Sequence, residues 1–132
     1  MVQRTAIEPS QELGRKAHLK HPIDRVHLAK QTLGDKGLEL EVLRMFDDTI
    51  RVYFSRLETS TTRDELLRHL HTIRGAASGI GANTIALLAR RAEADLRDGL
   101  PVDPERIDDL EMAVTECSVF IEDLLARETS HH

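Results

Sequence analysis

The chain contains few of the residues that cross-link a protein or build β-sheets. Its 132 residues include one cysteine, Cys117, and no tryptophan, and only 3% of them are aromatic. A single cysteine cannot form an internal disulfide, and its place in an apolar periodic run predicts a buried thiol. The core must be built from Leu, Ile, Val and Ala, which favours packed helices over sandwiched strands. No segment alternates apolar and polar residues strictly, so we expect no strands.

Long apolar runs and an excess of positive charge are also missing. No stretch has the apolar length of a membrane helix, and the N-terminus lacks the apolar region of a signal peptide. The formal net charge is −5, which does not favour binding to nucleic acid or to anionic membranes. We therefore expect a cytoplasmic protein that binds neither.

The chain divides into one domain and two short ends. Residues 1–21 are polar and aperiodic, which predicts a flexible N-terminal arm, and residues 129–132 form a tail. Residues 22–128 carry the helical pattern of a single domain. A short helix is predicted after Pro22, with its stripe at Ile23, Val26, Lys30 and Leu33.

Four longer helices are predicted after this short one. The first has an apolar stripe at Leu43, Phe46, Ile50, Tyr53 and Leu57. Thr62 and Glu65 have the spacing of a capping box, which starts the second helix at about residue 63 and lets it run to about residue 80. Gly81 ends that helix, and we expect Asn83 to cap the third. Asp103 and Pro104 open the fourth. The pattern predicts an all-α fold, an up-down-up-down four-helix bundle with a short additional N-terminal helix.

The second long helix places two glycines in its interior, although glycine costs about 1 kcal/mol relative to alanine there. At about 100° per residue, its apolar residues cluster on one arc. A second cluster lies about 130° away, with spacing i, i+3, i+4 and i+7. We call it the His71 stripe, and it consists of His71, Arg74, Gly75 and Ser78.

Each residue type in the His71 stripe suits phosphoryl transfer. A neutral imidazole is a nucleophile toward an acyl phosphate without a general base. Arg74 can offset the charge of a phosphoryl group on that ring, and as an exposed cation it should contribute little to folding. Gly75 removes bulk beside the ring, and Ser78 can donate a hydrogen bond at the rim. The alternative is that the stripe is only a solvated helix face, which periodicity alone leaves open.

At these residues the sequence resembles the histidine-containing phosphotransfer (HPt) domain family. That family has the signature His-x-x-Lys/Arg-Gly on an exposed helix, and here His71-Thr72-Ile73-Arg74-Gly75 matches it. The similarity spans roughly residues 22–99, and the matching positions outside the signature are Ile23-Asp24, Leu33-Gly34-Asp35, Val42-Leu43, Phe46, Gly81-Ala82, Ile85, Ala89 and Ala92-Glu93. Two positions depart from the family, because Arg74 replaces the commoner Lys and Leu70 precedes the histidine where Ala is frequent. Arg keeps the charge but presents a planar fork.

The resemblance implies a histidine phosphotransfer protein of a two-component phosphorelay. His71 would accept a phosphoryl group from a receiver-domain aspartate and pass it to, or take it back from, another receiver. The partners would be response-regulator receiver domains or a hybrid histidine kinase. The chain would be a monomeric phosphocarrier without autokinase activity and without a cofactor, since the receiver holds the Mg²⁺. Receiver docking is expected around Gly75, Ser78, Thr72 and Arg68.

Three other functions are weighed against this one. A metal site is disfavoured because His69 and His71 point about 160° apart on a helix and no Cys/His spacing fits zinc. A dimeric histidine-kinase phosphoacceptor fragment often has an acidic residue and then a proline after its histidine, whereas Thr72 follows here. A helical docking module without chemistry is excluded only by the coincidence of residues at the His71 stripe.

Overall fold

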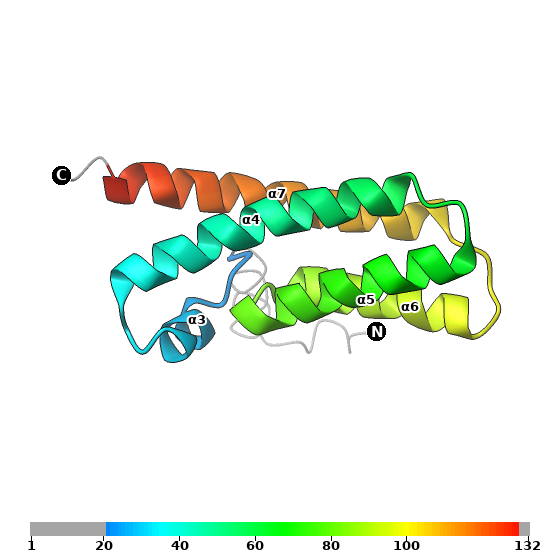
Figure 1. Ribbon diagram of the computed structural model, residues 1–132, viewed down its shortest axis with the longest axis horizontal. Coiled ribbons are helices and arrows are strands. Elements are labelled where there is room, and N and C mark those ends of the chain that lie inside the picture. Colours follow the sequence, from blue (N-terminus) through cyan, green and yellow to red (C-terminus); the bar gives the residue numbers. More distant parts are fainter. Residues whose placement is uncertain (1–20, 130–132) are drawn as a thin grey trace, which may run out of the picture.

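The computed structural model describes residues 21–129, which form five helices. The first helix is short, and the four longer ones alternate in direction along the bundle (Figure 1). The predicted arm, apart from its last residue His21, and residues 130–132 of the tail lie outside the described range. The helices are α3 (Arg25–Gln31), α4 (Lys36–Glu58), α5 (Arg63–Ile80), α6 (Asn83–Arg97) and α7 (Pro104–Thr129). The predicted all-α bundle with a short additional N-terminal helix is confirmed, and the described residues contain no strand. No helix within residues 21–129 is both long and apolar enough to cross a membrane.

Four of the five described helices begin where a short polar side chain accepts from one of the first backbone N–H groups. The Thr62 hydroxyl accepts from the Glu65 N–H at 3.1 Å, and the Glu65 carboxylate accepts in return from the Thr61 N–H at 3.1 Å. This contact lowers the pKa of Glu65. Asp103 accepts from the Glu105 N–H at 2.9 Å at the start of α7.

The predicted cap at Asn83 is wrong. Residue Asn83 is already the first residue of α6, and Ala82 occupies the cap position without any side-chain hydrogen bond. Ala82 is fully buried, and its carbonyl accepts from the Ala86 N–H at 3.1 Å. Helix α6 thus starts one residue earlier than the capping preference predicts, and its N-cap position carries no side-chain hydrogen bond.

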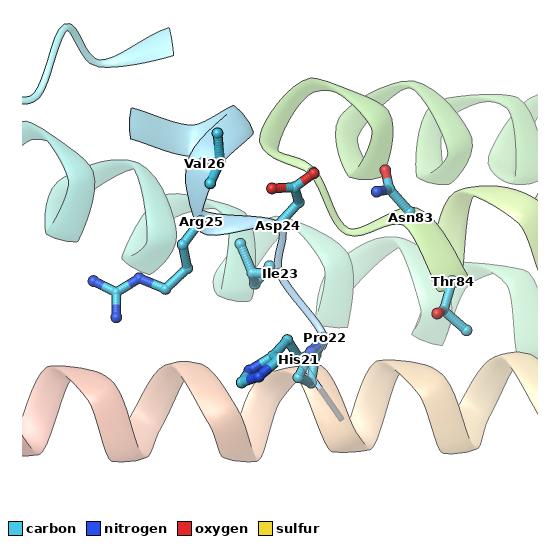
Figure 2. A pocket seen from close by; sticks show the side chains of 9 residues that line it. His21, Pro22, Ile23, Asp24, Arg25, Val26, Asn83 and Thr84 are labelled. Atoms are coloured by element: carbon cyan, nitrogen blue, oxygen red, sulfur yellow. The ribbon is translucent and has the colours of Figure 1, made fainter. Parts of the chain in front are cut away.

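Gly81 joins α5 to α6 and binds the segment that leads into α3. Its φ of +85° favours glycine, and a Cβ there would lie 3.0 Å from the Asp24 carbonyl oxygen. The Asp24 N–H donates to the Gly81 carbonyl at 2.9 Å, while the Asp24 side chain caps α3 through the His27 N–H. Figure 2 shows Asp24 on the coil that leads into α3, opposite Asn83 and Thr84 of α6, and these residues line a pocket of about 310 Å³. This turn fixes the C-terminal end of α5.

The predicted stripe of the first short helix is also wrong in part. Ile23 is buried, but Val26 and Leu33 are 68% and 93% exposed, and Leu28 is the buried residue of α3 instead. The helix is only seven residues long, and its orientation follows from the Asp24 contact with Gly81 rather than from its own pattern. In so short a helix a periodic apolar pattern does not decide which face is buried.

The core lies between the four long helices. The apolar stripe predicted for α4 is buried apart from the half-buried Tyr53, and α5 packs between α4 and α6. Two faces of α5 are thereby covered, and the face that carries the His71 stripe remains toward solvent. The fully buried large side chains include Leu28, Leu43, Ile50, Leu70, Ile73, Leu110, Cys117 and Ile121.

Candidate functional site

The His71 stripe lies on α5 as predicted, with the histidine turned outward. The side chain of His71 is 65% exposed, whereas Leu70 and Ile73 beside it are buried. His69 lies on another side of the helix, where its ring packs at 6.0 Å from the ring of Tyr53 on α4. The helix therefore separates the two histidines, and they form no joint site.

The small residues of the stripe leave open space beside His71. Gly75 and Ser78 are exposed, and a Cβ added at Gly75 would meet no atom within 4 Å. Packing within residues 21–129 therefore does not require glycine at position 75. Of the two other residues expected in the docking surface, Arg68 is exposed, but the Thr72 hydroxyl donates to the Arg68 carbonyl at 3.1 Å. The hydroxyl proton of Thr72 is therefore engaged within α5.

Arg74 differs from the exposed cation that the sequence predicts. Its side chain is only 29% exposed, and its Nε donates to Glu93 Oε2 at 2.5 Å. The Nη2 atom of Arg74 lies 2.9 Å from Nδ1 of His71. The hydrogen bond to Glu93 and then the charge of Glu93 raise the pKa of Arg74. The expectation of an exposed cation is wrong, because tertiary packing brings a buried carboxylate from α6 against Arg74.

Glu93 belongs to the site, although its sequence position alone did not indicate a role for it. Its side chain is 0% exposed, and it contacts Arg74, Arg97 and His71. Arg97 Nη2 donates to Glu93 Oε1 at 3.1 Å, and His71 Nδ1 lies 3.6 Å from the same oxygen. One signal could have identified it: Glu93 lies four residues after the buried Ala89 and seven after Ala86, so an acidic residue continues the buried row of α6.

Among residues 21–129, the other titratable groups form no cluster that could compete with His71. In the part of the chain that the structure describes, no group of three or more His, Cys, Asp or Glu side chains could hold a metal ion. Cys117 is 1% exposed, and burial followed by the charge of Asp47 raises the pKa of its thiol to about 12. A buried neutral thiol is a poor nucleophile. The exposed imidazole of His71 is better placed for chemistry with a second protein.

Comparisons with known proteins agree with this arrangement. The profile of the Hpt domain family, described as "Hpt domain", matches residues 41–127, about two thirds of the 132-residue chain. No curated protein matches the chain. A solved structure, the HPT domain from the Hpt sensor hybrid histidine kinase from Shewanella, superimposes with a TM-score of 0.71 at 21% identity. The match covers 82% of this chain and 97% of that one, and at this identity it supports the bundle fold.

The matched region includes α5, α6 and the whole of the His71 stripe with Glu93. The resemblance based on the residues around His71 is therefore confirmed by a match that extends over most of the bundle. The chain belongs to the Hpt domain family, and its role is histidine phosphotransfer in a two-component phosphorelay.

Proposed function

We propose that His71 is the phosphoacceptor and that its Nε2 forms the bond to phosphorus. The observation that carries this assignment is the orientation of the ring: Nδ1 faces Arg74 and Glu93, while Nε2 has no hydrogen-bond partner among residues 21–129 and belongs to a side chain that is 65% exposed. A nucleophile that attacks another protein's acyl phosphate must reach past its own helix. Nε2 of His71 meets that requirement.

The transfer step needs little from this chain besides the ring and its charged neighbours. The lone pair of Nε2 attacks phosphorus, the bond between phosphorus and the aspartyl oxygen breaks, and the aspartate leaves as a carboxylate. The reverse step returns the phosphoryl group to an aspartate. Arg74 lies one turn from His71 and supplies positive charge near the phosphoryl oxygens. Gly75 leaves space for the receiver's acidic pocket, which brings the Mg²⁺.

We propose response-regulator receiver domains as partners, alone or within a hybrid kinase, in the cytoplasm. The chain would act as a monomeric carrier without autokinase activity. The support is the chemistry of the site: the His71 stripe supplies a nucleophile and a cation, and a receiver domain would supply the acidic pocket and the Mg²⁺. Docking would use Gly75, Ser78, Arg68 and Thr72.

The test uses receiver domains loaded from ³²P-labelled acetyl phosphate. We expect wild-type protein to take up label that is labile in acid and stable in base, and His71→Gln to take up none. His69→Gln is the matched control, because His69 lies on the same helix but packs against Tyr53, and it should accept label normally. Label on His71→Gln, or no transfer to wild type from any receiver of the same genome, would refute the assignment. Labelling from ATP alone, or a dimer by size-exclusion mass, would favour a kinase fragment instead.

A further inference from the structure

The negative charge of the protein is concentrated on one helix. The chain has 23 acidic and 18 basic residues, which give a formal net charge of −5. Helix α7 alone carries eight acidic residues and two arginines, a net charge of −6, so the rest of the chain is close to neutral. Because α7 packs against α4 and α6, it lies diagonally across the bundle from α5. The acidic side of the protein is therefore the side opposite the His71 stripe.

Helix α6 presents a second exposed row beside the His71 stripe. Its members are spaced by three, four and three residues, and we call them the α6 row: Leu87, Arg90, Ala94 and Arg97. The contact between Arg74 and Glu93 fixes how the two helices align. Since they run antiparallel (Figure 1), Arg97 lies level with His71, and Arg90 lies two turns farther along the stripe. The α6 row thus borders the stripe along its length.

Two arginines around the stripe lack the acidic partners that other arginines have. Arg106 of α7, for example, pairs with Asp95 at 2.7 Å. By contrast, Arg68 and Arg90 are exposed, one near each end of the stripe, and neither forms an ion pair within 4 Å with any of residues 21–129. An exposed charge adds little to stability. In a chain with more acidic than basic residues, this local excess of positive charge is better explained by what it attracts.

The charges that surround the stripe are positive when they are taken together. Four arginines lie there, and one carboxylate contacts two of them, so these five groups sum to +3: Arg68, Arg74, Arg90, Arg97 and Glu93. Attraction by this patch and repulsion by α7 act in the same sense on an acidic partner. Both turn the partner toward the side of the bundle that carries His71.

Screening by salt decides which of the two charges matters more. Packed helices lie about 8–10 Å apart, so the axes of α5 and α7 lie about 13 Å apart across the bundle. The Debye length is about 10 Å at 0.1 M salt. At that concentration a partner beside the stripe senses the arginines rather than α7. The arginines of the patch are therefore the groups to test.

We propose that the α6 row extends the docking surface around His71 and that Arg90 recruits receiver domains whose docking face is acidic. This inference rests on the proposed function of His71. The acidic pocket of a receiver carries the aspartyl phosphate, so the charge that Arg90 attracts surrounds the group to be transferred. Leu87, which is 40% exposed, adds apolar contact at the end of the row. The stripe supplies the chemistry, and the row raises the fraction of encounters in which the phosphoryl group meets the ring.

The first experiment compares Arg90→Glu with Arg91→Glu. Arg91 is also exposed and changes the net charge equally, but it lies about 100° farther around α6, away from α5. In about 0.05 M salt, we expect Arg90→Glu to lower the second-order rate constant of transfer from a phosphorylated receiver about tenfold, the lower end of the range for electrostatic steering. Arg91→Glu should stay close to wild type. In about 1 M salt, where the Debye length is about 3 Å, Arg90→Glu should approach wild type as well.

The second experiment separates the charge of the patch from the charge of the whole protein. Asp108 is exposed on α7, and Asp108→Lys raises the net charge by the amount that Arg90→Glu lowers it. We expect Asp108→Lys to transfer at the wild-type rate in 0.1 M salt. Reversing the exposed acidic residues beside the receiver's phosphoacceptor to lysine, one at a time, should identify one whose reversal restores the rate with Arg90→Glu. Rapid-quench measurements supply all of these rate constants.

Several results would overturn the role of the α6 row and leave His71 as the phosphoacceptor. They are equal slowing by Arg90→Glu and Arg91→Glu, faster transfer by Asp108→Lys, slowing by Arg90→Glu that persists in 1 M salt, and no restoration by any reversed receiver residue. If instead wild-type protein takes no label from any receiver, the proposed function itself fails.

Discussion

Two substitutions of Gly75 allow its effect on stability and its effect on the phosphotransfer rate to be measured separately. It lies inside α5, four residues after His71, and a Cβ there would meet no atom within 4 Å. Gly75→Ala should therefore keep the helix and remove the conformational cost of an interior glycine, about 1 kcal/mol. For a domain of this size that is a rise in melting temperature of about 4 °C.

The same position should be sensitive to bulk during transfer. A leucine at position 75 projects from the face that carries His71, so the receiver's acidic pocket must dock farther from Nε2. A displacement of this kind costs about a hundredfold in rate, because the reacting atoms no longer meet in line. We expect Gly75→Leu to retain the helicity of the wild type and to lose most of its transfer rate.

Gly79 provides the matched control. It is exposed on the same helix, and a Cβ there also meets no atom within 4 Å, but it lies one turn farther from His71. Thermal denaturation followed by circular dichroism should show Gly75→Ala and Gly79→Ala stabilised alike. Rapid-quench transfer from a phosphorylated receiver should show Gly75→Leu slowed far more than Gly79→Leu. Wild-type transfer by Gly75→Leu would refute docking across the His71 stripe, and destabilisation by Gly75→Ala would refute the open space beside it.

Two further predictions concern charge and burial. Arg74→Ala should slow phosphoryl acceptance about tenfold and lower the free energy of unfolding by about 2 kcal/mol, since it leaves the buried Glu93 with Arg97 as its remaining arginine. Parallel transfer assays and urea titrations check this, and normal transfer with a large loss of stability would make Arg74 purely structural. Because folding raises the pKa of Cys117 to about 12 from an ordinary 9.0, the stability that its neutral thiol contributes is complete below pH 9 and is lost as the pH rises toward 12. Cys117→Ser should flatten that decline in urea titrations, and the native thiol should react with Ellman's reagent only after denaturation.

Much of the bundle could be predicted from local chemistry. The Thr62–Glu65 box and the left-handed Gly81 bound α5 at the predicted residues, because caps and positive-φ glycines act within one turn of the backbone. The outward position of His71 also followed from spacing alone, since its helix has an apolar face strong enough to fix which side is buried.

The environment of His71 could not be predicted in the same way. Glu93 comes from another helix, 19 residues after Arg74 in the chain, and its contact with Arg74 depends on how α6 is rotated against α5. Spacing within one helix places a side chain on a face but does not give the facing residue on its neighbour. For the same reason Arg74 was predicted to be an exposed cation, whereas packing joins it to a buried carboxylate. The reactive residue and its helix are thus local properties of the sequence, while the charge network behind its ring arises only when the two helices pack together.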